Sequence, residues 1–212
     1  MTEFDSTLRS FVTAASSGSP TPGGGSVASV AAALGAALNA MVGRLSQGSR
    51  YASHTEQMQV AVVRMEEAIQ ELEVILSADI QAFERYIQAR KLPRETDGQK
   101  ETRDQVLQST AVESTEIPLR LARSCRDLLE YSFEMAPYAN RNGISDLGVA
   151  AILLEAAARS ALLTVEFNLL EISDVTVRNL AYQESDQIRV SVEQRLRQTM
   201  EIVRQRFAKG VY

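Results

Sequence analysis

The sequence is poor in histidine and cysteine, the side chains on which many metal sites and nucleophilic catalysts depend. Among its 212 residues there is one histidine, His54, one cysteine, Cys125, and no tryptophan. A histidine-based metal site needs more than one imidazole, and a Ser-His-Asp or Cys-His pair would have to use His54 itself. We expect His54 to be exposed near a helix start. Acid–base chemistry should therefore fall to carboxylates.

The single cysteine also excludes an internal disulfide, which favours a cytoplasmic location. The N-terminal segment MTEFDSTLRSF lacks the basic and apolar regions of a signal peptide. The longest apolar stretch, residues 144–170, contains four charged side chains, too many for a membrane span. The formal net charge of −5 argues against a broad nucleic-acid-binding surface. We predict a cytoplasmic protein with neither membrane nor nucleic acid as a partner.

Proline and glycine are scarce as well, with 5 and 11 copies, and neither occurs in residues 51–92. Both residues disfavour helix interiors, so their absence predicts long helices. Apolar residues recur at helical spacing, and no segment alternates like a β-strand. We predict an all-α, single-domain bundle of about six helical segments over residues 1–212. With the parts before and after Pro118 given separately, the expected segments cover residues 3–15, 27–45, 53–91, 97–114, 119–135, 145–172 and 174–207.

Capping residues and helix breakers set the expected boundaries. Ser26 and Ser145 are good N-caps for the segments that follow them, and Asp174 opens the last segment. Pro118 marks a break or a kink. The segment over 27–45, which follows a glycine-rich loop, consists almost entirely of small or apolar residues. It should be buried on most sides and pack closely against its neighbours.

Asp79 lies on the apolar face of the helix expected over 53–91. Steps of three and four along that face give Leu72, Leu76, Asp79 and Phe83. A carboxylate in that position must be paired, hydrogen-bonded or protonated, and its pKa should depart from the ordinary value. This is a property of general acid–base groups. The alternative is a structural ion pair with an arginine of a neighbouring helix.

Asp146 is a second candidate, in the first turn of the helix expected over 145–172. The next eight residues are apolar, which puts Asp146 at the edge of the core. The alternative is a capping carboxylate that interacts with the helix dipole. Farther along the same helix, Glu155, Arg159 and Glu166 share a face that would form either a subunit contact or a pocket wall.

The stretch Pro20–Ser26 is a glycine-rich turn that leads into a helix start. Unpaired N–H groups at such a start can hold an anion. No strand precedes the stretch, so it does not match the Walker or dinucleotide-binding fingerprint. The alternative is a simple tight connection between helices.

Several short motifs occur in a fixed order. Residues 20–26 read Pro-Thr-Pro-Gly-Gly-Gly-Ser and lead into an Ala-rich helix. They are followed by Asp79-Ile80-Gln81-Ala82-Phe83, Lys91-Leu92-Pro93-Arg94, Ile117-Pro118-Leu119, Ser145-Asp146-Leu147-Gly148-Val149-Ala150 and Asn168-Leu169. In order and spacing, from about residue 11 to residue 174, this set resembles the formiminotetrahydrofolate cyclodeaminase and methenyltetrahydrofolate cyclohydrolase family.

The resemblance implies an all-helical fold that forms a homodimer, with the pterin site in a cleft near the glycine-rich loop. It implies a tetrahydrofolate substrate, with or without a polyglutamyl tail, and no metal or organic cofactor. The reaction would convert 5-formiminotetrahydrofolate to 5,10-methenyltetrahydrofolate and ammonia. One alternative is a cyclohydrolase that forms 10-formyltetrahydrofolate, and another is a non-catalytic folate-binding or helical interaction protein. The chain would be the stand-alone form of a domain that the family also fuses to a formiminotransferase.

Together with the resemblance, these features assign roles to individual residues. We expect Asp146 and Asp79 to be the acid–base and electrostatic pair, with Asp146 the stronger candidate. Arg50 and Arg94 would hold the carboxylates of the glutamyl tail, with the N–H groups of the glycine-rich loop as a second candidate. The expected substrate-binding residues are Thr21, Pro22, Gly23, Gly24, Gly25, Ser26, Arg50, Arg94, Asn142, Ser145 and Asn168.

Three positions depart from the family pattern. Gly48-Ser49-Arg50-Tyr51 stands where the family has a basic Gly-Lys-Lys-Lys-Tyr-like stretch, Arg94 replaces a lysine, and Thr164 replaces an asparagine. Arginine keeps the positive charge but does not release its proton, so acid–base catalysis by a lysine would be lost at position 94. These departures motivate the non-catalytic alternative.

Overall fold

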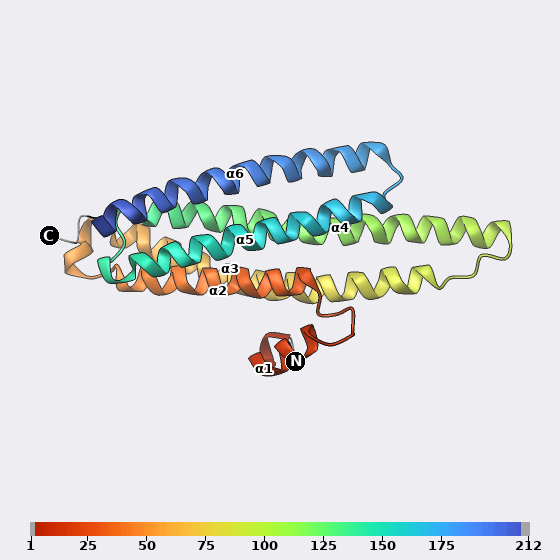
Figure 1. The fold of residues 1–212 in the computed structure, drawn as a ribbon, viewed down its shortest axis with the longest axis horizontal. Helices are drawn as coiled ribbons and strands as arrows, with labels where there is room; N and C mark the ends of the chain where they lie inside the picture. Colours follow the sequence, from red (N-terminus) through yellow and green to blue (C-terminus); the bar gives the residue numbers. More distant parts are fainter. Residues whose placement is uncertain (1–2, 209–212) are drawn as a thin grey trace.

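The computed structural model describes residues 3–208, apart from the side chains of Glu3 and Arg50, and no β-strand occurs in this range. The helices are α1 (Leu8–Ala15), α2 (Gly24–Leu45), α3 (Thr55–Arg90), α4 (Asp97–Met135), α5 (Ile144–Asn168) and α6 (Val175–Ala208). The long helices run side by side along one axis, and the short α1 lies beside the bundle (Figure 1). The predicted all-α class is confirmed.

α2 packs against both α3 and α5, and its small residues allow a close approach. A Cβ added to Gly43 would lie 2.6 Å from Val62 Cγ2 of α3. One added to Gly35 would lie 3.0 Å from Leu154 Cγ of α5. Glycine therefore sets the spacing between α2 and both neighbours. The remaining side of α2 carries exposed large side chains, among them Leu34.

Of the two outcomes expected at Pro118, a break is wrong, because α4 continues through it as one helix of 39 residues. Pro118 is buried in the middle of that helix. A proline there removes one backbone hydrogen bond. The turns on both sides remain helical because α4 packs against α3, α5 and α6. Tertiary packing thus overrides the local preference of one residue.

The other helix boundaries in the structure differ from the predicted ones by a few residues. The expected segment 3–15 is divided into a 3-10 turn, Glu3–Asp5, and α1. α2 begins two residues before Ser26, and α5 begins one residue before Ser145, so neither serine is the N-cap. Asp174 is the N-cap of α6, because its Oδ1 accepts hydrogen bonds from the backbone N–H groups two and three residues later, at 2.8 and 3.1 Å.

By length and composition, two helical stretches would be able to cross a membrane. They are α2 and residues 141–171, each with a mean hydropathy of 1.6 over its most apolar window. In this fold, 61% and 56% of those windows are buried inside the protein. Both stretches pack against other helices of the bundle, as core helices do.

Candidate functional site

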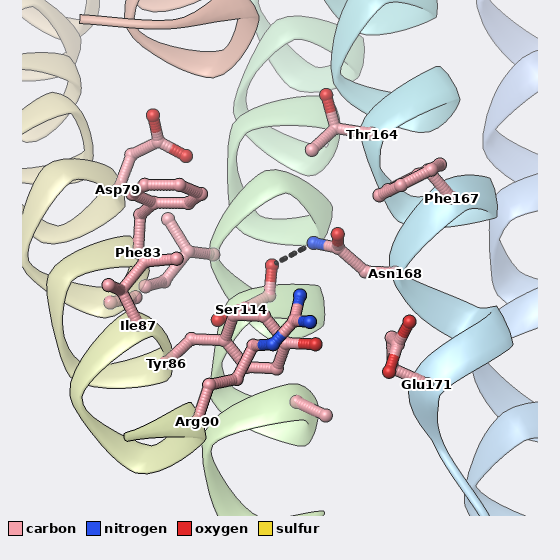
Figure 2. A pocket seen from close by; sticks show the side chains of 13 residues that line it. Asp79, Phe83, Tyr86, Ile87, Arg90, Ser114, Thr164, Phe167, Asn168 and Glu171 are labelled. Carbon is pink, nitrogen blue, oxygen red and sulfur yellow. Dashed lines mark hydrogen bonds between the residues drawn. The ribbon is translucent and has the colours of Figure 1, made fainter. Parts of the chain in front are cut away.

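A pocket of about 320 Å³ opens between α3, α4 and α5, which is within the size range of small-molecule sites. Figure 2 shows Asp79 at one end of it and Arg90 and Glu171 at the other. The lining residues are Asp79, Ala82, Phe83, Tyr86, Ile87 and Arg90 of α3, Ala111, Ser114 and Ile117 of α4, and Thr164, Phe167, Asn168 and Glu171 of α5 and the turn after it.

The carboxylate of Asp79 packs against the first turn of α2. The hydroxyl of Ser26 donates a hydrogen bond to Asp79 Oδ2 at 3.1 Å, and the backbone N–H of Ser26 donates another. Burial raises the pKa of Asp79, and the two hydrogen bonds oppose this rise. Among the described residues, no lysine or arginine forms an ion pair with Asp79. Within residues 3–208, Asp79 therefore does not form the structural ion pair that was the alternative explanation from the sequence.

Gly25 makes this contact possible. A Cβ at this position would lie 2.5 Å from Asp79 Oδ1 and 2.8 Å from its Cγ, closer than real Cβ atoms come. Any side chain at position 25 would therefore displace the carboxylate. The anion at this helix N-terminus is Asp79 itself, and it already uses the N–H of Ser26. This N–H group is therefore not available to the glutamyl tail, which makes binding of the tail at this loop less favourable.

The rest of the glycine-rich loop lies at the edge of the site. Thr21, Pro22 and Gly23 are half-buried, and Gly24 is exposed. Thr21 lines a separate groove, which shares only residues of α3 with the pocket. The loop thus positions Asp79 through its last two residues, Gly25 and Ser26.

The opposite wall of the pocket comes from α5 and α4. Asn168 lies in this wall, and its Nδ2 donates a hydrogen bond of 2.7 Å to the backbone oxygen of Ser114. Thr164, the departure from the family asparagine, faces the pocket one turn earlier on α5 (Figure 2). The hydroxyl of Ser114 is buried and has no hydrogen-bond partner in the described residues. A buried hydroxyl without a partner calls for an explanation, and a bound ligand supplies one.

At its far end the pocket becomes polar. The hydroxyl of Tyr86 lies between the Glu171 carboxylate and the Arg90 guanidinium (Figure 2). Burial, followed by the negative charge of Glu171, raises the pKa of Tyr86, so the hydroxyl keeps its proton at neutral pH. The pocket therefore has the carboxyl group of Asp79 at one end. At the other end it has a polar cluster in which Glu171 is negatively and Arg90 positively charged.

Asp146 is not part of this pocket. It lies in the first turn of α5, whereas Asn168 is the last residue of that helix, 22 positions later. At about 1.5 Å per residue, the two are roughly 33 Å apart. The structure therefore does not assemble the expected pair of Asp79 and Asp146 within one chain. Asn142 and Ser145 are exposed and lie at the same distant end as Asp146.

The two arginines expected to bind the glutamyl tail are also outside the pocket. Arg94 is exposed in the turn between α3 and α4, and it does not line the cavity. The side chain of Arg50 lies outside the described residues, and its backbone belongs to a 3-10 turn that precedes α3. Because the pocket begins 24 residues into α3, that turn is roughly 36 Å from Asp79.

His54 is half-buried rather than exposed. Its ring stacks on Tyr138 with a centroid distance of 3.7 Å, at the N-terminal end of α3. Like Arg50, His54 is separated from Asp79 by the first 24 residues of α3. No group of three or more His, Cys, Asp or Glu side chains within residues 3–208 is placed to hold a metal ion.

Several pocket residues were missed from the sequence, and some had a signal there. Phe83, Tyr86 and Arg90 follow Asp79 at intervals of four, three and four, so the periodicity that selected Asp79 also selects them. Ser114 and Glu171 had no such signal, because they belong to other elements and reach the pocket only through tertiary packing.

Comparisons with known proteins give a consistent result. The family model described as formiminotransferase-cyclodeaminase matches residues 7–187. The chain is 38% identical over 168 residues to formimidoyltransferase-cyclodeaminase from Gallus gallus, which covers 79% of the chain and 31% of that protein. It is 34% identical over 163 residues to methenyltetrahydrofolate cyclohydrolase from Methylorubrum extorquens, which covers 76% of the chain and 78% of that protein.

A solved structure is similar over nearly its whole length. The crystal structure of formiminotetrahydrofolate cyclodeaminase from Thermotoga maritima has a TM-score of 0.85 and 28% identity, with 94% of this chain and 96% of that chain covered. The chain spans about a third of the length of the vertebrate relatives, which carry both names in one protein. It spans most of the cyclohydrolase and of the Thermotoga cyclodeaminase.

Proposed function

The chain belongs to the formiminotransferase-cyclodeaminase family, and on this basis we propose that it converts 5-formiminotetrahydrofolate to 5,10-methenyltetrahydrofolate and ammonia. The observation that carries the proposal is the half-buried carboxylate of Asp79, held by the first turn of α2 at the head of a small-molecule pocket. A carboxyl group whose pKa is raised by burial binds a proton more readily than an exposed one, which suits it to take up and return a proton.

In the proposed reaction, N10 attacks the formimino carbon, which is already bonded to N5 and to the imino nitrogen, and forms its third bond to nitrogen. Asp79 accepts the proton that N10 loses and returns it to the former imino nitrogen. With one further proton from solvent, this nitrogen leaves as ammonia, and its bond to the carbon breaks. The product is the cationic methenyl bridge. A carboxylate beside that bridge also stabilises the positive charge as it forms, and no metal or organic cofactor takes part.

The walls of the pocket suit the rest of the substrate. Phe83 and Phe167 stand on opposite sides of the cavity and offer apolar surface to a pterin ring (Figure 2). Asn168 and the free hydroxyl of Ser114 lie between them and the polar far end. We place the pterin near Asp79 and the p-aminobenzoyl group along α3 toward Arg90.

Cyclohydrolase activity is the second candidate, supported by the similarity to the Methylorubrum enzyme over 78% of its length. The purified protein should be given 5-formiminotetrahydrofolate while methenyl absorbance and ammonia are followed together, and 5,10-methenyltetrahydrofolate in a parallel assay. Equal amounts of both products in the first assay, above the uncatalysed rate, are expected. Activity in the second assay alone would assign the protein as a cyclohydrolase. Tight folate binding without turnover in either assay would leave a non-catalytic binder.

The hydrogen bond from Ser26 sets the pH range of the reaction. Because the reacting form of Asp79 is the carboxylate, kcat/KM should fall as the pH drops through the pKa of Asp79. Ser26→Ala removes one of the two hydrogen bonds that lower this pKa, so the acid limb of the profile should move to higher pH. Ser29→Ala is the control, since its hydroxyl bonds the carbonyl oxygen of Gly25 at 3.0 Å instead. An unchanged limb in Ser26→Ala would argue against Asp79 as the base.

We also propose that the protein is a cytoplasmic homodimer. α2 and α5 pack on each other, and each leaves a row of large apolar side chains exposed. These are Val27, Leu34, Met41 and Leu45 on α2, and Val149, Ile152, Leu163, Phe167 and Leu170 on α5. Rows of this extent on a folded protein mark an interaction surface, and a second copy of the same chain would cover it symmetrically.

A single charge should separate this dimer. Leu34 is 55% exposed on α2, and Leu34→Glu would place a carboxylate in the proposed interface. Light scattering of the 23.3 kDa chain should give twice that mass for the wild type and a monomer for the variant. Leu180→Glu is the control, because Leu180 is 62% exposed on α6, away from both rows. A wild-type monomer, or equal dissociation by both variants, would contradict the proposed interface.

A further inference from the structure

A second cavity, of about 250 Å³, adjoins the polar end of the pocket. The two cavities share Tyr86, Arg90 and Glu171, so they form one path along α3. The second cavity adds Arg103 and Gln108 of α4. The path therefore begins at Asp79 and ends between two arginines. Neither Arg90 nor Arg103 was selected from the sequence, where Arg50 and Arg94 were the expected anion-binding residues.

Arg103 is held in place but not neutralised. Its Nη2 donates to the backbone oxygen of Arg90 at 3.3 Å, which joins the end of α3 to the start of α4. Its nearest carboxylate is that of Asp104, an exposed residue, at 3.9 Å. The Nε of Arg103 is buried and has no hydrogen-bond partner in the described residues. A buried guanidinium N–H without an acceptor is costly, and an anion in the cavity would satisfy it.

The charge at this end of the path is positive. Arg90 forms no ion pair among residues 3–208, and Arg103 has only the long contact with Asp104. The opposing charge inside the cavity is Glu171, whose carboxylate lies near the hydroxyl of Tyr86. Two guanidinium groups against one carboxylate leave a net attraction for an anion. Arginine also matches a carboxylate geometrically, with two parallel N–H donors.

The spacing fits an elongated substrate. Arg90 lies 11 residues after Asp79 on the same helix, which is about 16 Å at 1.5 Å per residue. The free hydroxyl of Ser114 lies along this path. A tetrahydrofolate with its reacting carbon at Asp79 would extend its p-aminobenzoyl group past Ser114 and present the glutamate carboxylate to the arginines.

We propose that Arg90 and Arg103 form the subsite that binds the glutamate carboxylate of the folate. The proposal rests on the proposed function, and it assigns substrate specificity to two residues that do not touch the reacting atoms. It also predicts that binding depends on the tail: the arginines contribute to tetrahydrofolates and contribute nothing to tetrahydropteroate amides, which have neither the glutamate nor another carboxylate.

The test is an equilibrium binding measurement, so that it does not depend on turnover. Two unreactive ligands are compared by calorimetry on the intact protein: 5-formyltetrahydrofolate and the carboxamide of 5-formyltetrahydropteroate, called the pteroate below. Arg90→Gln and Arg103→Gln should each weaken binding of the folate about tenfold or more and leave binding of the pteroate unchanged. Arg103→Lys should recover part of the loss, because it restores the charge but not the planar pair of donors.

The exposed Arg94 supplies the matched control. Arg94→Gln removes the same charge from the turn just after α3 and should change neither affinity. If the wild type binds folate and pteroate equally, or if Arg90→Gln and Arg103→Gln weaken both ligands alike, the proposed subsite is wrong while the folate function stands. If the wild type binds neither ligand, the proposed function fails and the subsite with it.

Discussion

Replacing Asp79 with asparagine should lower kcat by about 10²–10⁴-fold, the usual contribution of a general acid–base group. Asparagine keeps the shape of the side chain and still accepts the hydrogen bond from Ser26, but it cannot carry a proton between nitrogens. Because burial raises the pKa of Asp79, keeping its charge in the folded protein has a cost that asparagine does not have. The variant should therefore melt no lower than the wild type. Turnover and thermal melting of the two proteins check both parts.

Asp146→Asn is the comparison that gives this result its meaning. Asp146 is roughly 33 Å from the pocket along α5, so its loss should leave kcat within about tenfold of the wild type. Equal, small effects of both substitutions would remove Asp79 from the reaction. A loss of several orders of magnitude in Asp146→Asn would instead mean that the site extends across a second copy of the chain.

Replacing Gly25 with alanine should be nearly as damaging, although the new methyl group is small. Its Cβ would lie 2.5 Å from Asp79 Oδ1, so the carboxylate must move away from the first turn of α2. A shift of about 1 Å in a reacting group is enough to cost about 10²-fold in rate. Alanine favours helix over glycine by about 0.5–1 kcal/mol, so the folded state should not be weakened.

Gly24→Ala is the matched control for this substitution. A Cβ on Gly24 meets no atom within 4 Å, although it adds the same methyl group one residue earlier. This variant should keep its activity, whereas Gly25→Ala should lose most of it at an unchanged melting temperature. If the two variants behave alike, the close approach of the carboxylate to α2 is not what the glycine provides.

The reason that Asp79 was found from the sequence is local. Its position among Leu72, Leu76 and Phe83 depends only on the helical period, and α3 has no glycine or proline to interrupt that period. The contact that holds its carboxylate in place could not be predicted in the same way. The hydrogen bond to Ser26 joins residues 53 positions apart, and nothing in either segment names the other.

The expected pair of Asp79 and Asp146 is not assembled within one chain, for a reason that was already available. Both carboxylates interrupt apolar patterns, and such a pattern identifies unusual residues without placing them in space. The predicted helix over 145–172 itself separates Asp146 from Asn168 by about six turns, at 3.6 residues per turn. Two residues at opposite ends of one long helix cannot share a small substrate within one chain, and helix length alone would have shown this.

The polar end of the pocket marks where sequence reasoning stops. Arg90 shares the helical face of Asp79 and was within reach of the pattern. Arg103 and Ser114 belong to α4, and their relevance depends on how α4 lies against α3. An unsatisfied buried atom is a property of the packed structure, so no sequence pattern shows it.

The central claim is that the pocket between α3, α4 and α5 holds the folate with its reacting carbon at Asp79. A crystal structure with 5-formyltetrahydrofolate, whose formyl oxygen takes the place of the imino nitrogen, tests it directly. We predict that the formyl group or N10 lies within about 3.2 Å of the Asp79 carboxylate. The glutamate should lie toward Arg90. A pterin bound at the other end of α5, beside Asp146, would contradict the claim.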